Sequence, residues 1–279
     1  LWGWGRNDYG QAGLATGTVL PALSWTQVAN GDSFTVAIRN DGKLFAWGLN
    51  SSGQLGDGTI VNKSSPVQIG TSSWTQITIG GTQTQGILID RTLYAWGTNT
   101  NGVLGDYTTV AKSSPVLIGA ITLVSQSSPT QLGSLSWSKV SSSLSHTLAI
   151  RSDGLMYAWG LNSSGQLGLQ SDTLSRSSPV QIGIGSSWKI VAAGLAHSLA
   201  IRSDNTLFAW GLNASGILGN GDTINRSSPV QVGTLSWNKI FTMYNSSMGA
   251  IRSDGTLWTW GYDGYGQLGN NSTTGTYSP

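Results

Sequence analysis

The chain contains no cysteine and no glutamate, and only 9% of its 279 residues are charged. Without cysteine, disulfides, thiolate nucleophiles and cysteine-ligated zinc are excluded. Paired-carboxylate catalysis would have to use aspartate alone, and most aspartates fall in repeated turns. The sequence therefore predicts no catalytic residue, no cofactor and no metal site.

The chain also lacks a charge excess and a long apolar run. The formal net charge is +2 and is spread along the sequence, so a nucleic-acid partner is not expected. No apolar segment is long enough to span a bilayer, and no signal peptide or lipidation motif is present, so membrane insertion is not expected either. The chain starts at Leu1 and both ends fall inside a repeat, so we expect it to be part of a longer protein.

What is abundant is tryptophan, and it recurs in a pattern. Versions of Trp-Gly-x-Asn-x-x-Gly-x-Leu-Gly occur six times, and Ser-Trp-x-x-Ile/Val precedes five of them by 22 or 23 residues. A period near 50 residues is typical of stacked supersecondary units. The Trp-Gly motifs start at Trp4, Trp47, Trp96, Trp159, Trp210 and Trp260, and the Ser-Trp motifs are at Trp25, Trp74, Trp137, Trp188 and Trp237.

Each unit is predicted to be a four-stranded antiparallel sheet. In one unit, strands are expected at 137–140, 146–151 and 155–160, with Asp153-Gly154 as the hairpin turn, and a fourth strand at Pro179. Radial packing of such sheets gives an all-β fold, a β-propeller. We expect one domain over residues 1–279, with five complete repeats and partial repeats at both ends, making six or seven blades if closed. The tryptophans are interpreted as core packing rather than ligand stacking.

These motifs resemble the repeat of the regulator of chromosome condensation family. The resemblance is closest at Trp47–Gly56 and Trp159–Gly168 and covers nearly the whole chain. The family's Gly-x-x-His-Ser/Thr pattern is kept at Gly194–Ser198 and, in its second half, at His146-Thr147. We assign Phe34, Gln85 and Ser247 to the histidine position of the other units. Both histidines are expected to be buried and satisfied by backbone groups rather than catalytic.

Two sets of residues are candidate partner-binding positions. A basic residue precedes Ser-Ser-Pro in four units, and symmetry would place these residues as a ring on one face. The alternative is a neutral rim, with the cations offset by Asp57, Asp106, Asp172 and Asp222. The second set is the joint of a local duplication, for which neutral slippage is the alternative to a selected contact. The basic set is Lys63, Lys112, Arg176 and Arg226, and the joint is Ala120, Ile121, Thr122, Leu123, Val124, Ser125 and Gln126.

The function expected from this reasoning is a non-catalytic interaction scaffold that binds a protein or glycan surface within a larger assembly. Similarity to prokaryotic or phage members of the family implies a location outside a bacterial cell or in a virion. The family resemblance leaves two alternatives open. One is guanine-nucleotide exchange on a small GTPase. The other is inhibition of an enzyme by a propeller face, for which exposed loop tyrosines would be the sign, with Tyr9, Tyr107, Tyr262 and Tyr265 as candidates.

Overall fold

The described structure is built almost entirely of strands. The computed structural model describes residues 24–118, 136–170, 172–185, 187–242 and 247–279. Within these ranges there are nineteen strands and one short 3-10 turn, η1 (Thr100–Gly102). The all-β fold class is confirmed.

The strands form five antiparallel sheets, and neighbouring strands in each sheet are consecutive in the chain. The first sheet contains β1 (Trp25–Asn30), β2 (Phe34–Arg39), β3 (Leu44–Gly48) and β4 (Lys63–Gln68). The second contains β5 (Trp74–Ile79), β6 (Gln83–Leu88), β7 (Leu93–Gly97) and β8 (Lys112–Leu117). The third contains β9 (Trp137–Ser142), β10 (His146–Arg151), β11 (Met156–Gly160) and β12 (Arg176–Gln181).

The fourth and fifth sheets continue the pattern. The fourth contains β13 (Trp188–Ala193), β14 (His197–Arg202), β15 (Leu207–Gly211) and β16 (Arg226–Gln231). The fifth contains β17 (Trp237–Thr242), β18 (Ser247–Arg252) and β19 (Leu257–Gly261). In place of a fourth strand, the described part of this sheet has one isolated bridge, between Gly261 and Thr276. Four rather than five of the repeats are therefore complete four-stranded sheets within the described ranges.

The outer strand of each complete sheet begins earlier than expected. β4 starts at Lys63, three residues before Pro66, and pairs with β3 through Gly48 and Ala46 with a register shift between them. Proline is tolerated here because an edge strand leaves some backbone nitrogens without a ladder partner. The four basic candidates therefore stand at the first residues of β4, β8, β12 and β16.

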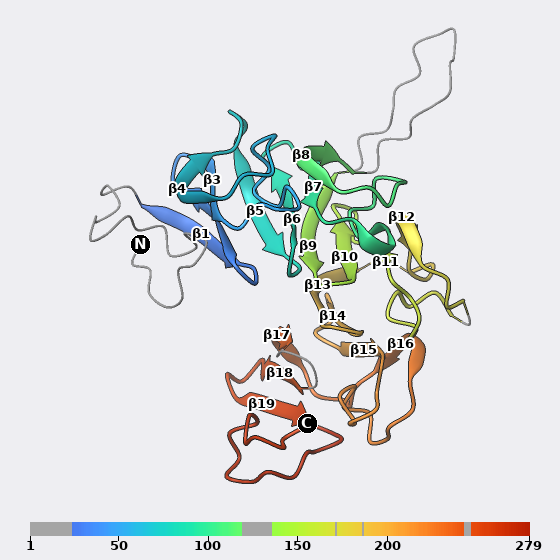
Figure 1. Ribbon diagram of the computed structural model, residues 1–279. Helices are drawn as coiled ribbons and strands as arrows, with labels where there is room; N and C mark the ends of the chain where they lie inside the picture. Colours follow the sequence, from blue (N-terminus) through green and yellow to red (C-terminus); the bar gives the residue numbers. More distant parts are fainter. Residues whose placement is uncertain (1–23, 119–135, 171, 186, 243–246) are drawn as a thin grey trace, which may run out of the picture.

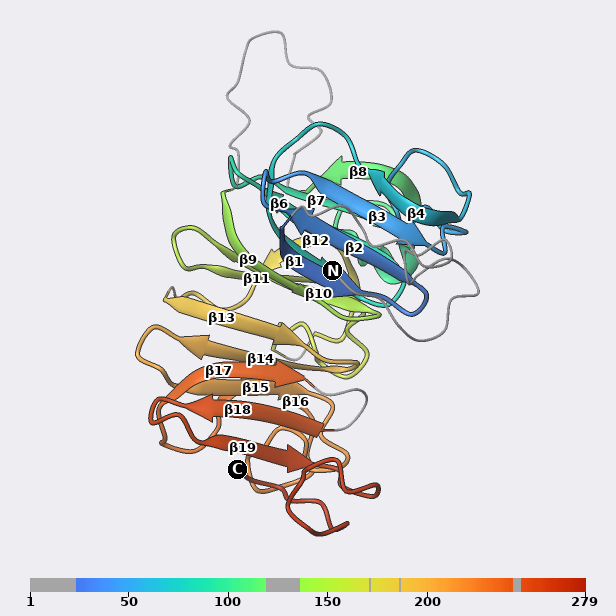
Figure 2. The same ribbon diagram turned by 90° about the vertical axis from the view of Figure 1, so that its left-hand side faces the viewer.

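The sheets are arranged radially, which confirms the propeller (Figure 1). Consecutive innermost strands β1, β5, β9, β13 and β17 contact one another, while β4, β8, β12 and β16 lie at the periphery. Figure 2 shows the strands of the fourth and fifth sheets from the side, and β13 contacts β17. Residues 1–23 lie outside the described ranges, so the number of blades stays a prediction.

Tryptophans fill the sheets and the seams between them. In the second sheet, Trp74 and Trp96 meet edge to face with ring centroids 5.5 Å apart. The indole nitrogen of Trp96 donates to the carbonyl oxygen of Gln54 in the preceding unit at 3.0 Å. Trp159, Trp210 and Trp260 make the equivalent bond to Val103, Gln166 and Ile217. Core packing of the tryptophans is confirmed, and each Trp-Gly tryptophan in this series also binds its unit to the one before.

Alternation of strand direction divides the loops between two faces. β1 and β3 run the same way, so the β1–β2 turn and the β3–β4 loop lie at the same end of the sheet. A hydrogen bond from Leu49 N to Ser33 O, 2.8 Å long, joins them. We call the face formed by these turns and loops in all units the outer-loop face. The β2–β3 turns and the β4–β5 connections, with their counterparts, lie on the opposite face.

Candidate interaction surface

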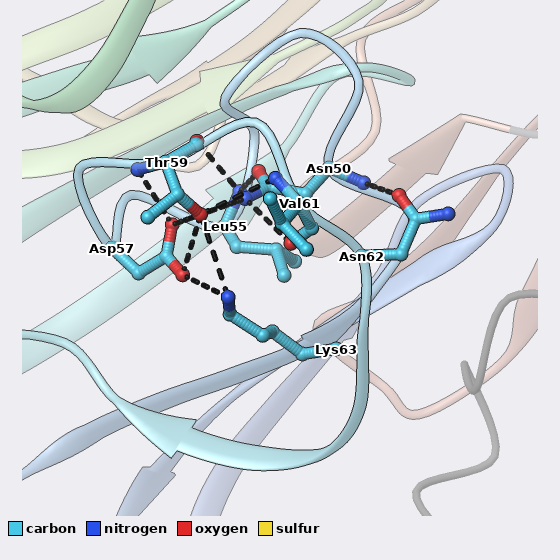
Figure 3. A network of polar contacts seen from close by, with 7 residues as sticks. All are labelled: Asn50, Leu55, Asp57, Thr59, Val61, Asn62 and Lys63. Atoms are coloured by element: carbon cyan, nitrogen blue, oxygen red, sulfur yellow. Dashed lines mark hydrogen bonds and ion pairs between the residues drawn. The ribbon is translucent and has the colours of Figure 1, made fainter.

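Each loop on the outer-loop face is held by the asparagine of the Trp-Gly-x-Asn motif. The Asn50 side chain is fully buried, and its Oδ1 accepts from Leu55 N at 3.0 Å. Its Nδ2 donates to Asp57 Oδ1 at 3.0 Å and to the carbonyl oxygen of Val61 at 3.2 Å. Figure 3 shows these contacts converging on one amide. A single buried side chain thus fixes a loop that has no regular secondary structure.

The same arrangement recurs in the next units. Asn99 donates to Asp106 Oδ1 at 2.9 Å and to Val110 O at 3.1 Å. Asn213 donates to Asn220 Oδ1 and to Ile224 O, both at 3.1 Å. In the third unit, Asn162 donates to Asp172 O at 2.5 Å. These loops are preorganised, so little conformational entropy would be lost when they bind a partner.

The four basic candidates pair with aspartates of their own loops. Lys63 Nζ lies 3.1 Å from Asp57 Oδ2, Lys112 makes the same contact with Asp106 at 3.1 Å, and Arg176 and Arg226 pair with Asp172 and Asp222. The structure thus places them at equivalent peripheral positions, each beside the acid that the neutral-rim alternative named. Contact of these cations with a partner stays a prediction.

The ion pairs also set the charge state of the loop acids. Burial alone raises the pKa of Asp57, but hydrogen bonds from Thr59, Lys63 and Asn50 outweigh it and leave the pKa below its usual value. The pKa of Asp106 is lowered in the same way against its burial, by Thr108, Lys112 and Asn99. Both acids therefore stay ionised near neutral pH and hold the lysines within the loops.

Sequence reasoning missed the aliphatic residue two positions before each basic residue. Its carbonyl oxygen is tied to the loop asparagine in three of the units, yet its side chain faces solvent. A repeated, exposed aliphatic side chain on a fixed loop is the kind of group that anchors a protein partner. The sequence signal that could have identified these aliphatic residues is their fixed spacing, two positions before each basic residue. The exposed fractions are 61% for Val61, 65% for Val110, 68% for Leu174 and 63% for Ile224.

Three of the four candidate tyrosines are also exposed on this face. Tyr107 is 52% exposed, Tyr262 40% and Tyr265 89%. The rings of Tyr262 and Tyr265 meet edge to face, with centroids 6.1 Å apart. These tyrosines are therefore available to a partner rather than packed between blades. Tyr9 lies outside the described residues.

A hollow opens on the same face near the innermost strands. It has a volume of about 440 Å³ and is formed by the turns after β1, β5, β9 and β13, with Leu144 and Leu195 in its wall. Leu144 is 52% exposed and Leu195 37%. The outer-loop face therefore carries apolar groups both at its rim and near its centre.

The second set of candidates, Ala120–Gln126, lies outside the described residues. The strands on either side of it are β8, which ends at Leu117, and β9, which begins at Trp137. Those two strand ends belong to the face opposite the outer loops. Contact of this segment with a partner stays a prediction.

The two histidines are buried between sheets, as expected, but their surroundings differ from the prediction. His146 Nδ1 lies 2.9 Å from Ser143 Oγ, and its Nε2 lies 2.9 Å from Ser198 Oγ in the next sheet. Hydroxyl groups rather than backbone groups thus contact this ring, and His197 Nε2 has no hydrogen-bond partner among the described residues.

Strand register also corrects the residue assigned to the histidine position of the second sheet. Gln83, not Gln85, occupies it, because Gln83 pairs with Gly97 as His146 pairs with Gly160.

Burial determines the protonation of both rings. It lowers the pKa of His146 to about 3, with a further contribution from His197, and lowers the pKa of His197 to about 4. Neutral imidazoles sealed from solvent can join sheets but have no route to a substrate.

Neither a metal cluster nor a membrane-spanning helix is found in the described part of the chain. Within those ranges, no three histidine or acidic side chains are grouped so as to hold a metal ion. No helix there is both long and apolar enough to cross a bilayer.

Comparison with known proteins identifies relatives along the whole chain. The family described as the RCC1-like domain matches residues 1–279. The chain is 29% identical over 229 residues to the ultraviolet-B receptor UVR8 of Arabidopsis thaliana, which covers 78% of this chain and 50% of UVR8. It is 42% identical over 229 residues to the human protein named probable E3 ubiquitin-protein ligase HERC3, covering 77% of this chain but 21% of HERC3. The chain thus spans half or less of these relatives.

Solved structures support the same fold. Human WBSCR16 superposes with a TM-score of 0.84 at 21% identity, covering 100% of this chain and 75% of that one. Yeast RCC1 (Prp20), solved with Kap60, superposes with a TM-score of 0.81 at 18% identity, covering 99% and 69%. At these identities the likeness concerns the fold alone.

Proposed function

Because this chain belongs to the family of RCC1-like domains, we propose that it is a non-catalytic scaffold whose outer-loop face binds a protein partner. One observation carries the proposal: Val61, Val110, Leu174 and Ile224 are exposed at equivalent positions of four consecutive units. The backbone carbonyl oxygens of three of them, Val61, Val110 and Ile224, accept hydrogen bonds from the buried loop asparagines. Rigid loops with apolar side chains at their tips favour protein recognition.

Solved relatives support a protein as the partner. One structure contains Kap60 bound to yeast RCC1, and another reports binding of Prp20p to Gsp1p and histones. Both observations concern those proteins, and they support a protein as the class of partner. For this chain a glycan is the competing class of partner, and a binding experiment distinguishes the two.

The test removes the repeated aliphatic side chains together. A variant with Val61→Ser, Val110→Ser, Leu174→Ser and Ile224→Ser should fold normally, since exposed substitutions change stability by about 0.5 kcal/mol or less each. It should lose at least tenfold in affinity for the partner captured by the native protein from its source material. The control is Ile89→Ser with Ile184→Ser, which changes aliphatic residues on the opposite face that are more exposed, at 72% and 102%.

Unchanged binding by the fourfold variant would contradict the proposal, as would capture of a glycan that the variant binds equally well. A nucleotide-release assay with a small GTPase is run in parallel. The scaffold proposal expects no acceleration, and acceleration would favour the exchange-factor alternative.

Enzyme inhibition is the second candidate, because Tyr107, Tyr262 and Tyr265 are exposed on the outer-loop face. Inhibition is a special case of the proposed scaffold, with an enzyme as the partner. An inhibition assay against candidate partner enzymes tests it directly. Inhibition that is lost on Tyr265→Ala would establish the inhibitor function. Absence of inhibition would contradict it and would leave the scaffold proposal unchanged.

We also propose a location outside a bacterial cell or in a virion, on the basis of the Ser-, Thr- and Asn-rich loops. This proposal is independent of the binding surface. Immunodetection in fractionated source material tests it, and finding the protein only within the cytoplasm would contradict it.

A further inference from the structure

The fifth outer loop differs from the others at the residue that holds it together. Asp263 stands where the preceding units have Asn50, Asn99, Asn162 and Asn213. Its side chain is fully buried, and Oδ1 accepts from Leu268 N at 2.8 Å, as the asparagine oxygens do in the other loops. Oδ2 replaces the donating amide and has no hydrogen-bond partner among the described residues.

The rest of the loop follows the course of its relatives. Ser272 N donates to Asn270 Oδ1 at 3.0 Å, and Thr274 N donates to Ser272 Oγ at 2.9 Å. The first loop has the same two bonds, from Thr59 N to Asp57 Oδ1 and from Val61 N to Thr59 Oγ1. The two loops therefore share the turn at residues 57–61 and 270–274.

The shared turn identifies what surrounds the position of Oδ2. In the fourth loop the amide of Asn213 donates to four oxygens, at 3.0 to 3.1 Å: Oδ1 of Asn220, Oδ1 of Asp222 and the carbonyl oxygens of Asp222 and Ile224. Their counterparts in the fifth loop are Oδ1 of Asn270, the hydroxyl of Ser272 and the carbonyl oxygens of Ser272 and Thr274. A carboxylate has no proton to give to such oxygens, and no group of the described residues donates to Oδ2.

No basic side chain of this segment compensates the carboxylate. The position taken by Lys63, Lys112, Arg176 and Arg226 in the other units is occupied by Thr276, which pairs with Gly261 through its backbone. The sequence contains no Lys, Arg or His between Arg252 and Pro279. A buried, unpaired carboxylate surrounded by oxygens is strongly unfavourable unless a cation joins them.

We propose that the loop of residues 263–274 binds a hard divalent cation, and specifically calcium. Calcium takes six to eight oxygen ligands, including carboxylates, amide oxygens and backbone carbonyls. Asp263, Asn270, Ser272 and Thr274 supply these types, and water completes the set. An open hollow of about 570 Å³, lined by Gly266 and residues 271–274, gives a hydrated ion access to the loop. The site has a single carboxylate, so it lacks the group of three acidic or histidine side chains by which metal sites are usually recognised.

The test uses the 279-residue protein freed of metal with a chelator, and follows its melting temperature as calcium chloride is added. The native protein should be stabilised by roughly 3 °C or more at saturating calcium, and sodium chloride at equal ionic strength should not reproduce the shift. Asp263→Asn restores the amide, so this variant should melt at or above the metal-free native protein and should not respond to calcium. The matched control, Asp254→Asn, removes an exposed carboxylate from the same sheet and should keep the calcium response.

Calorimetric titration with calcium chloride should give one site in the native protein and none in Asp263→Asn. An equal calcium response in both proteins, or no response in either, would overturn the proposal. So would a native protein whose stability relative to Asp263→Asn rises in mild acid but does not respond to calcium, because a proton rather than a metal ion would then join Oδ2 to the loop oxygens.

Discussion

At the scale of single residues, the structure assigns separate physical roles to the recurring residues of the repeat. The asparagine organises the outer loop from within, and the tryptophan bonds to the preceding unit. The Leu-Gly glycine makes that bond possible: Gly56 has φ +79°, and a Cβ added there would lie 2.6 Å from the indole nitrogen of Trp96. These residues recur because each unit needs the same loop and the same seam.

Replacing the loop asparagine should therefore destabilise the protein. Asn50→Ala removes the buried acceptor of Leu55 N and the donor to Asp57 Oδ1 and Val61 O, and a buried group left unsatisfied costs about 1–3 kcal/mol. We expect the free energy of unfolding to fall by about 2–4 kcal/mol in urea titration. Ser51→Ala, at the exposed neighbouring position, should have little effect. Equal losses in the two variants would show that the amide does not hold the loop.

The seam glycine allows a controlled comparison within one loop. Gly56→Ala combines left-handed strain with the clash against Trp96, whereas Gly58 has φ +82° and its nearest contact would be 3.6 Å away. Gly58→Ala should lose only the strain, about 1–2 kcal/mol. Gly56→Ala should lose at least about 2 kcal/mol more, measured as the difference in unfolding free energy. Similar values for both would mean that the seam adapts to the extra methyl group.

At the scale of sheets, neighbouring units are joined by polar groups as well as by tryptophan. His146 in β10 reaches Ser198 in β14, and Gln83 in β6 donates to the carbonyl oxygen of Ser143 at 2.6 Å. Glutamine and histidine at one position of different units thus each bond to the next sheet, although to different partners. Only histidine makes the junction sensitive to pH.

Stability should consequently decrease in mild acid. The pKa values of about 3 for His146 and about 4 for His197 lie below the unfolded value, which is about 6.5. The unfolded chain then binds more protons, so the contribution is complete above about pH 6.5 and is lost as pH falls toward 4. Each pKa unit corresponds to about 1.4 kcal/mol, so the loss should reach several kcal/mol.

The control is the double variant His146→Gln with His197→Gln, which introduces at both positions the residue that the second sheet already has at Gln83. Its urea midpoint should vary much less between about pH 6.5 and about pH 4.5 than that of the native protein. A native protein with the same slope as the variant would contradict the burial of neutral rings.

At the scale of the whole molecule, the fold was predictable because the same sequence pattern, and hence the same local structure, recurs in every repeat. Trp47, Trp96 and Trp159 could each be assigned to the core from periodicity alone, and the Asp-Gly turns located the hairpins. The candidate surface was only partly predictable. The ring positions of Lys63 and Lys112 followed from symmetry, but the exposure of the aliphatic residues before them did not, because an aliphatic residue in a strand-rich sequence predicts burial. Their exposure depends on a loop path that local hydrogen bonds fix.

The aspartate at position 263 was likewise visible in the sequence, but its structural consequence could not be predicted from the sequence. A change from asparagine to aspartate becomes informative only when the acceptors around the amide in the other units are known. Because the units are equivalent, a residue that differs in one unit can be interpreted by comparing its surroundings with those of the same position in the other four units.

The central claim, that the outer-loop face is the binding face, is tested most directly by site-specific photo-crosslinking in the source material. A photoreactive side chain is placed at Val110 on that face or at Ile89 on the opposite face, which are 65% and 72% exposed. We predict that Val110 yields one recurring crosslinked protein and Ile89 does not. Crosslinking to the same protein from Ile89 alone, or equally from both positions, would contradict the claim.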